Sequence, residues 1–234
     1  ATDGRGNPAS AVQRIDVVDT TPPVASTKSA VAVLDASGQV SIPASAVDNG
    51  SADACGAVTL MVSPSTFHCG DVGPRTVTLT VTDACGLVSS ANATVTVVDN
   101  TAPVAVCQNV TVTLDATGNG STTAAAVNNG SSDACGIASL SLSRTTFTCA
   151  DVGPVPVTLT VTDVNGNSST CGATVTVVDN TAPVAVCQNV TVILDASGNG
   201  GTTVAAVNNG SSDACGIASL SLSRTTFTCA DVGP

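Results

Sequence analysis

Residues 153–178 read GPVPVTLTVTDVNGNSSTCGATVTVV, and this stretch decides the fold. Within Val155–Thr162, apolar residues alternate with threonines, so the apolar side chains fall on one face of an extended strand. β-Branched residues suit such a pleated, half-buried surface. The turn residues of Asp163–Asn167 follow, and alternation resumes over Ser169–Val178. The stretch therefore predicts a β-hairpin with a short turn.

The composition extends this prediction to the whole chain. The 234 residues are 43% hydrophobic but only 1% aromatic, and they include no Trp, no Tyr and a single Met. Glu is absent and Lys occurs once, so good helix formers are scarce. We therefore expect packed cores built mainly from Val and Ala, with almost no α-helix.

The sequence contains an internal repeat. The pattern that begins at Asp99 begins again at Asp179, and the distance between these two residues is the repeat length. Residues 99–154 recur at 179–234 with only four changes, and a diverged copy of the same pattern begins at Asp19. Residues 1–19 match the end of a repeat, at 161–179. The expected domains are the C-terminal strands of a preceding repeat (1–19), two full repeats (20–99 and 100–179), and the N-terminal part of a further repeat (180–234).

Each full repeat should contain about seven short strands, which fits an immunoglobulin-like sandwich of two sheets. The fold class is therefore all-β, with tandem domains. In the middle copy the expected strands are Val104–Cys107, Asn109–Leu114, Thr122–Val127, Ile137–Leu142, Thr145–Cys149, Val155–Thr162 and Ser169–Val178. A domain of this size with a single Phe has a thin core, so covalent cross-links are expected.

Ten cysteines provide candidates for those cross-links. Their spacing matches no zinc motif, so we expect disulfides formed in an oxidising compartment. Cys107 and Cys171 are expected to pair, because both are missing together in the preceding copy, where Thr27 and Ala91 stand. Cys85 and Cys187 have no assigned partner. The expected local pairs, each between neighbouring cysteines of one copy, are Cys55–Cys69, Cys135–Cys149 and Cys215–Cys229.

Charge and residue usage exclude several functions. The formal net charge is −11, which argues against nucleic-acid binding and against attraction to anionic lipid. No apolar stretch is long enough to predict a membrane span. The chain has no Glu and one histidine, His68, and it contains neither a nucleophile elbow nor a Gly-rich phosphate loop. We therefore do not expect an enzyme.

The motifs SDACG, TFTCADVG, TVTD-x-x-G and VVDNTAP are similar to those of a known group. The chain resembles, over essentially its whole length, the HYR-like and other immunoglobulin-like tandem repeats of large secreted surface adhesins of Bacteroidota. That resemblance implies a sandwich fold, an extracellular or cell-surface location, export by the type IX route, and an adhesive or stalk function. The repeat 20–99 departs from the pattern, since it lacks the long-range cysteine pair and contains Cys85.

Aspartates at fixed phases of the repeat suggest one further site. Carboxylate and amide oxygens at the domain junctions could hold Ca²⁺, and no other cofactor is expected. The candidate ligands are Asp19, Asp99, Asn100, Asp179 and Asn180. Asp also initiates turns without any metal, so both interpretations remain open.

The expected function is a non-catalytic, disulfide-stapled spacer or stalk within a long extracellular adhesin or surface filament. The alternative is an adhesion module in which each repeat binds a glycan or a protein. The expected partners are neighbouring repeats or subunits of the same protein, forming a fibre. The incomplete first and last repeats lead us to expect a longer polypeptide, rather than subunits that complete one another by donating residues 1–19.

Overall fold

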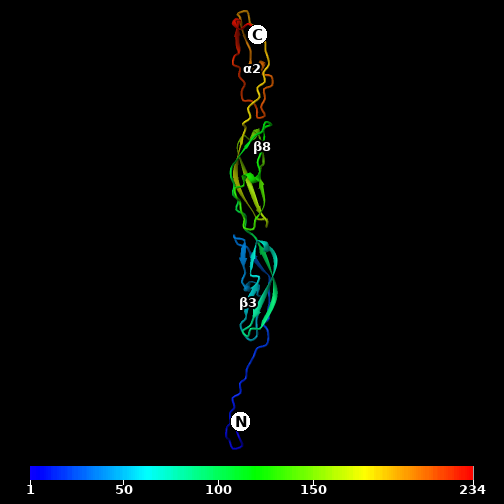
Figure 1. Cartoon of the computed structure of the whole chain (residues 1–234), viewed down its shortest axis with the longest axis vertical. Helices are drawn as coiled ribbons and strands as arrows, with labels where there is room; N and C mark the ends of the chain where they lie inside the picture. Colours follow the sequence, from blue (N-terminus) through cyan, green and yellow to red (C-terminus); the bar gives the residue numbers. More distant parts are fainter. Residues whose placement is uncertain (234) are drawn as a thin grey trace. The chain divides into compact units, whose positions relative to one another are not determined.

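The structure is a computed structural model that describes residues 1–233. The chain divides into two compact units, one comprising Ala1–Thr101 and the other beginning at Ala102. Each unit is built around β-sheets (Figure 1). Within residues 1–233, no helix is long and apolar enough to cross a membrane.

The first unit contains one four-stranded and one two-stranded sheet. The larger sheet has the order β1-β6-β5-β3, and β2 pairs with β4 in the smaller one. Its elements are β1 (Ala30–Val33), β2 (Gln39–Ser41), η1 (Ala44–Ala46), β3 (Thr59–Ser63), β4 (Thr66–His68), η2 (Cys69–Asp71), β5 (Gly73–Thr82) and β6 (Val88–Val98).

The second unit repeats this arrangement. Its larger sheet has the order β7-β12-β11-β9, with β7 parallel to β12 and the other pairs antiparallel, while β8 pairs with β10. The elements are β7 (Val110–Thr113), β8 (Asn119–Ser121), α1 (Ala124–Val127), β9 (Ile137–Leu142), β10 (Thr146–Thr148), η3 (Cys149–Asp151), β11 (Gly153–Asp163) and β12 (Ser168–Val178).

The core lies between the two sheets and follows the predicted alternation. Val157, Leu159 and Val161 on β11 are buried, whereas the threonines between them are not. From the smaller sheet, Phe147 fills the centre with 1% of its surface exposed. The remaining buried apolar residues of this core are Val112, Leu114, Val127, Ala173, Val175 and Val177. The all-β sandwich predicted from the sequence is confirmed.

Two expected strands differ from the structure. Val104–Cys107 forms only isolated bridges, from Val104 to Ser132 and from Cys107 to Asn128. The second half of Thr122–Val127 forms the single helical turn α1 instead. There the backbone N–H of Ala126 donates to Thr123 Oγ1 at 3.2 Å, so Thr123 caps a run of alanines. Alanine is the strongest helix former, and a threonine cap supplies the start signal.

The turn between β11 and β12 depends on a buried aspartate. Asp163 is 1% exposed, and its Oδ1 accepts hydrogen bonds from the backbone N–H groups of Asn165 (2.9 Å) and Asn167 (2.8 Å). Burial acts to raise the pKa of Asp163, but hydrogen bonds from Asn167 and Asn165 outweigh burial and lower it. Asp163 thus stabilises the turn through hydrogen bonds to its own backbone.

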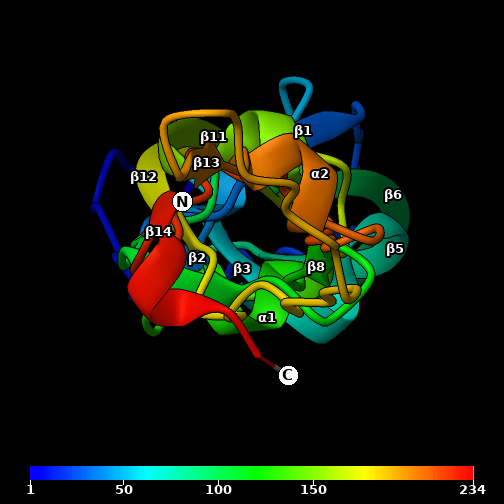
Figure 2. The same cartoon turned by 90° about the horizontal axis from the view of Figure 1, so that it is seen from above.

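Residues at the two ends carry less regular structure. Residues 1–19 form a turn at Asp3 and an isolated bridge from Thr2 to Pro8, but the strands expected there are not formed. A two-stranded hairpin without further sheet partners is marginal, which accounts for the difference. Segment 180–234 contains β13 (Asn199–Gly201), α2 (Val204–Val207), β14 (Thr226–Thr228) and η4 (Cys229–Asp231), and Figure 2 shows α2 in orange. The repeat boundaries themselves stay predictions.

Candidate functional site at the junction of residues 100–179 and 180–234

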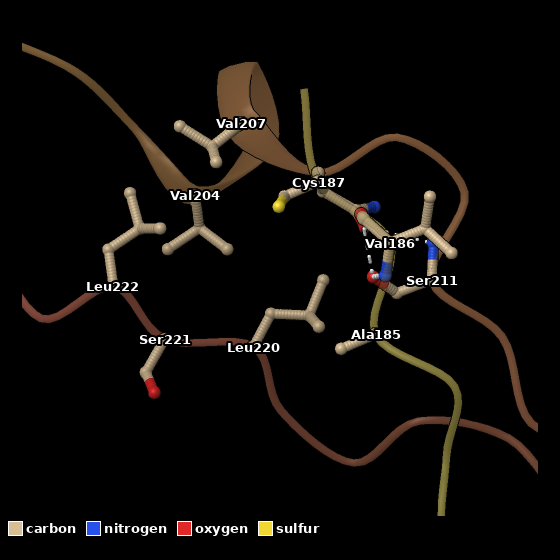
Figure 3. Close-up of a pocket in the computed structure, with 10 residues that line it drawn as sticks. Ala185, Val186, Cys187, Val204, Val207, Ser211, Leu220, Ser221 and Leu222 are labelled. Atoms are coloured by element: carbon tan, nitrogen blue, oxygen red, sulfur yellow. Dashed lines mark hydrogen bonds between the residues drawn. The ribbon is translucent and has the colours of Figure 1, made fainter. Parts of the chain in front are cut away.

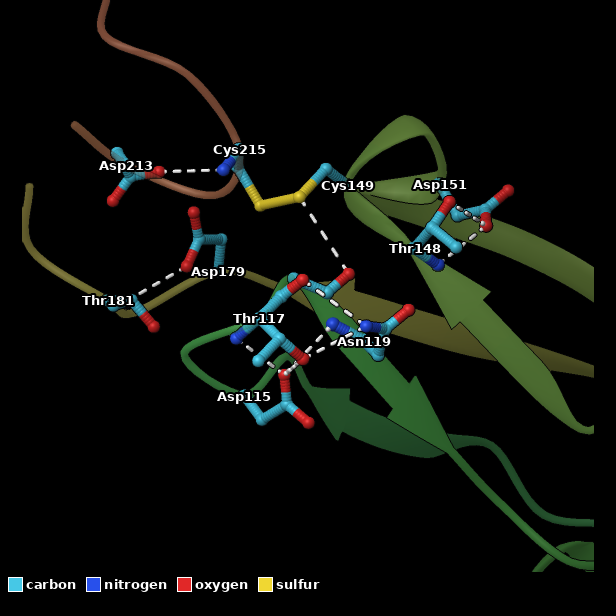
Figure 4. Close-up of a disulfide and its surroundings, with 11 residues drawn as sticks. Asp115, Thr117, Asn119, Thr148, Cys149, Asp151, Asp179, Thr181, Asp213 and Cys215 are labelled. Carbon is cyan, nitrogen blue, oxygen red and sulfur yellow. Dashed lines mark hydrogen bonds between the residues drawn. A yellow bond between two sulfur atoms is a disulfide. The ribbon is translucent and has the colours of Figure 1, made fainter.

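A disulfide joins the end of one repeat to the next. Cys149 follows β10, and Cys215 lies in a loop of the following repeat, 66 residues further along the chain. Their Cα atoms are 5.0 Å apart, within the usual range for a disulfide. Figure 4 shows this bond above the Asp115–Asn119 turn, with Asp179 of the connecting segment beside it.

The environment of Cys149 is built by a tight turn and a capped helical turn. Cys149 Sγ lies 3.7 Å from the carbonyl oxygen of Gly118, whose φ is +76°. A Cβ at position 118 would lie 2.5 Å from Cys149 Sγ, so only glycine fits there. Asp151 Oδ2 accepts the backbone N–H of Thr148 at 2.9 Å and also pairs with Arg144. These hydrogen bonds lower the pKa of Asp151 and hold the helical turn in place.

The environment of Cys215 is a short loop organised by an aspartate. Asp213 Oδ1 accepts the backbone N–H of Cys215 at 2.8 Å, and Gly216 N donates to the carbonyl of Asp213 at 3.2 Å. Ala214 lies next to the Gly118 turn, since a Cβ built at Gly118 would be 3.3 Å from Ala214 Cβ. The two repeats are therefore in direct contact around the disulfide.

The local disulfide pairs expected from the sequence are wrong. Cys149 bonds to Cys215, which excludes both Cys135–Cys149 and Cys215–Cys229, while Cys55 is a free thiol, which excludes Cys55–Cys69. The strand β11 gives the reason. Ile137, two positions after Cys135, pairs with Asp163 at one end of β11, whereas Cys149 begins the turn η3, which leads into Gly153 at the other end. The 11 residues of β11 span about 35 Å, too far for a disulfide.

The long-range pair is present. Cys107 and Cys171 form a disulfide with Cα atoms 5.9 Å apart, as their joint absence from the preceding copy predicts. This bond joins the segment before β7 to the middle of β12. Within residues 1–233, the free thiols are those of Cys55, Cys85, Cys187 and Cys229, all of them exposed.

Carboxylates gather beside the inter-repeat disulfide. One oxygen each from Asp179 and Asp213 and the Sγ of Cys215 lie within 4.8 Å of one another. Asp179 Oδ1 accepts the backbone N–H of Thr181 at 2.9 Å, as in an ordinary Asx-turn. Asp213 Oδ2, by contrast, is buried and has no hydrogen-bond partner among residues 1–233. Carboxylate oxygens are ligands of the kind that hard cations prefer, but the sulfur of a disulfide is not a Ca²⁺ ligand.

A similar cluster occurs in the first unit, around Asp19, Asp53 and Cys55. Asp19 Oδ1 accepts from Thr21 N at 2.9 Å, and Asp53 Oδ2 accepts from Cys55 N at 2.7 Å. A hydrogen bond to Asp19 raises the pKa of Cys55, and the charges of Asp19, Asp53 and Cys85 add to this effect. The Cys55 thiol therefore stays protonated to a higher pH than usual.

The other predicted junction residues are less clearly ligand-like. Asp99 is 7% exposed, and its Oδ1 accepts the backbone N–H of Thr101 at 3.0 Å. Asn100 and Asn180 are exposed. The prediction did not include Asp53 or Asp213. Their position at the same phase of every copy, shortly before a cysteine, is the sequence signal that they share with the predicted ligands.

An apolar pocket in segment 180–234 corresponds to an uncovered core. Figure 3 shows the Cys187 sulfur directed toward the space between Val204, Val207 and Leu220. In the repeat 100–179 the counterpart of Val207 is Val127, which is fully buried. There the counterpart of Cys187 is bonded to β12, a strand with no counterpart within segment 180–234. The lining of this pocket therefore consists mainly of counterparts of residues that form the core of the repeat 100–179 or pack against it.

Comparison with known proteins gives distant matches only. No family model matches the chain, and no curated protein matches it. Human mucin-like protocadherin EC1-2 is 12% identical, with 67% of this chain and 98% of that chain covered and a TM-score of 0.33. The protocadherin GammaB4 extracellular domain is 16% identical, with 73% and 34% covered and a TM-score of 0.36.

An endo-fucoidan hydrolase of glycoside hydrolase family 107 is also similar, at 18% identity, with 53% of this chain and 24% of that chain covered and a TM-score of 0.24. This chain thus spans about a quarter of the hydrolase and a third of the GammaB4 structure. At these TM-scores the named proteins lend the chain neither a ligand nor a partner. The fold class itself, a pair of tandem β-sandwich domains, follows from the sheet topology.

Proposed function

We propose that this chain is a structural repeat segment of a long extracellular adhesin or surface filament, where it acts as a disulfide-linked spacer. The observation that carries the proposal is the bond between Cys149 and Cys215, which ties one repeat covalently to the next. A bond at this place serves an array of domains. It contributes nothing to a pocket within a single domain.

Three further features support this function. Disulfides persist in oxidising surroundings, which favours an extracellular location. Near-identical copies, such as residues 99–154 and 179–234, increase length by equal increments. The net charge of −11 keeps such an array soluble. The partners of this segment are then neighbouring repeats or subunits of the same protein, and its role is non-catalytic.

Electron microscopy of the native particle tests the spacer function. Antibodies raised against the repeat 100–179 should label a fibre along its length, at regular intervals. Labelling confined to a fibre tip would instead favour the alternative, a ligand-binding adhesion module. Free monomers without any fibre would contradict the spacer function.

We also propose that the junction carboxylates bind a divalent cation, for which Ca²⁺ is the best candidate. The supporting observation is Asp213 Oδ2, which is buried without a hydrogen-bond partner among residues 1–233 and lies beside Asp179. A cation would satisfy this oxygen, and backbone carbonyls or water would complete its coordination. The exposed amide of Asn180 is the remaining nearby ligand candidate.

Calorimetric titration with Ca²⁺ tests the cation proposal. Asp213→Asn should lower the binding stoichiometry by one, whereas Asp195→Asn, in an exposed turn, should leave it unchanged. At a hundredfold excess over Kd, bound Ca²⁺ should stabilise the fold by about 2.7 kcal/mol. A melting temperature and a small-angle scattering profile that are the same in chelator and in Ca²⁺ would leave only the turn interpretation.

A further inference from the structure

The cysteines of the inter-repeat disulfide lie at opposite ends of their repeats. Cys149 begins the turn η3, which leads into the first residue of β11, Gly153. Cys135, the counterpart of Cys215 in the same repeat, lies near the last residue of β11, Asp163, which pairs with Ile137. The turn after β11 confirms this position, because Val164 N donates to the carbonyl of Gly136 at 3.2 Å. A repeat therefore carries one linking cysteine at each end.

The surroundings of the first cysteine recur in every copy. Cys69, Cys149 and Cys229 each follow a short strand and begin a 3₁₀ turn. Each Sγ lies 3.7–3.8 Å from the carbonyl oxygen of a glycine with φ near +75°. Those glycines are Gly38, Gly118 and Gly198.

The surroundings of the second cysteine recur as well. The backbone N–H groups of Cys55, Cys135 and Cys215 each donate to the aspartate two positions earlier, at 2.7–2.8 Å. Cys69 and Cys135, the counterparts of Cys149 and Cys215 in the preceding copies, are each disulfide-bonded. The local geometry for the same bond is thus present in each copy.

We propose that the inter-repeat disulfide is one member of a continuous series that makes the array nearly inextensible. If each repeat is bonded to the next in this way, the shortest covalent route through a repeat runs from one linking cysteine to the other, for example from Cys135 to Cys149. That route contains only the short backbone segment 135–149. The other residues of the repeat lie in loops that the disulfides close.

This arrangement limits how far tension can extend the chain. The segment 135–149 stretches to about 50 Å at most, which is close to the folded length of β11, about 35 Å. Without the inter-repeat bonds, the repeat 20–99, which lacks the long-range pair, would unravel to about 270 Å, whereas the Cys107–Cys171 bond still limits the repeat 100–179. The local pairs expected from the sequence would have protected only this short segment of each repeat, whereas the observed pair closes a loop of 66 residues. The inference deepens the spacer function, because it gives the spacer a fixed length under load.

Single-molecule stretching of the whole oxidised chain, held at its two termini, tests the series. The background variant is Cys107→Thr/Cys171→Ala, which copies Thr27 and Ala91 of the preceding repeat and removes the overlapping loop. In this background, adding Cys149→Ser/Cys215→Ser should release the 66-residue loop and lengthen the fully stretched chain by about 230 Å.

The fully stretched length depends on covalent bonds, so the result does not require that every variant keeps its full stability. The matched control is Cys85→Ser/Cys187→Ser, which alters two free thiols and should leave the length unchanged. A gain of only about 95 Å after Cys149→Ser/Cys215→Ser would reveal two short local loops and overturn the proposal. No gain would overturn it too.

Peptide mapping of the non-reduced wild-type chain should, in addition, recover Cys149 linked to Cys215. Recovery of Cys135 linked to Cys149 would contradict the series. These outcomes concern the bonds alone, so they are separate from the labelling experiment that tests the spacer function.

Discussion

Phe147→Ala should destabilise the repeat 100–179 by about 3–5 kcal/mol. Phe147 is the single aromatic residue of this repeat and is 1% exposed at the centre of its core. It pairs with Gly120 across the smaller sheet, so its ring packs against the larger sheet without a competing side chain. Domains of this size have a free energy of unfolding of only about 5–15 kcal/mol. The repeat would therefore lose a large share of its stability.

Hydrogen exchange of the β11 amides, followed by mass spectrometry in increasing denaturant, measures this loss for the repeat in question. Phe227→Ala is the matched control, because Phe227 has the same neighbours in sequence but is only partly buried. Phe227→Ala should lower the free energy of unfolding by clearly less than Phe147→Ala. A loss below about 1 kcal/mol for Phe147→Ala would mean that the core collapses around the missing ring.

The parts of the fold that follow from local pattern could be predicted from the sequence. The alternation in Val155–Thr162 and Ser169–Val178 identifies β11 and β12, because a half-buried strand has a period of two. The segment Thr122–Val127 has no such clear period, and a threonine cap before three alanines selects a helical turn. Propensity and capping therefore decide the structure where the apolar pattern is weak.

The disulfides show where local reasoning stops. Cys107 and Cys171 could be paired because both are absent from one copy. The pairs of neighbouring cysteines were assigned from closeness in sequence, but Cys135 and Cys149 lie at opposite ends of β11. Spacing alone does not determine connectivity. The strand register would have excluded the local pair, and no sequence pattern reports that register directly.

The acidic cluster depends on tertiary structure in the same way. Asp179 and Asp213 are far apart in the sequence, and the fold brings their carboxylate oxygens within 4.8 Å of each other. Their common signal is phase, since each recurs at the same place in every copy. Phase alone, however, does not distinguish a turn former from a ligand. The buried oxygen of Asp213 is the feature that favours a ligand, and it becomes visible only in the structure.

Removing the long-range disulfide from the repeat 100–179 should destabilise that repeat, and introducing it into the repeat 20–99 should stabilise the latter. Cys107→Thr/Cys171→Ala opens a loop of 64 residues, which costs about 4 kcal/mol in the chain-entropy estimate. In the repeat 20–99, Thr27 Oγ1 donates to the carbonyl of Asn92 at 2.8 Å and so joins the same two segments. A hydrogen bond of this kind recovers about 1 kcal/mol, so the net loss should be about 3 kcal/mol.

The reciprocal variant, Thr27→Cys/Ala91→Cys, places a cysteine at both equivalent positions of the repeat 20–99 and should stabilise it by a similar amount. The β6 and β12 amides, compared by hydrogen exchange in oxidised chains, report on the two repeats separately. Reduction should cancel the stability gained in Thr27→Cys/Ala91→Cys. It should also cancel the difference in stability between wild type and Cys107→Thr/Cys171→Ala. If the reciprocal variant formed its disulfide without slower exchange of the β6 amides, the entropic account of this cross-link would be wrong. The stability of these thin-cored repeats would then depend on their apolar packing alone.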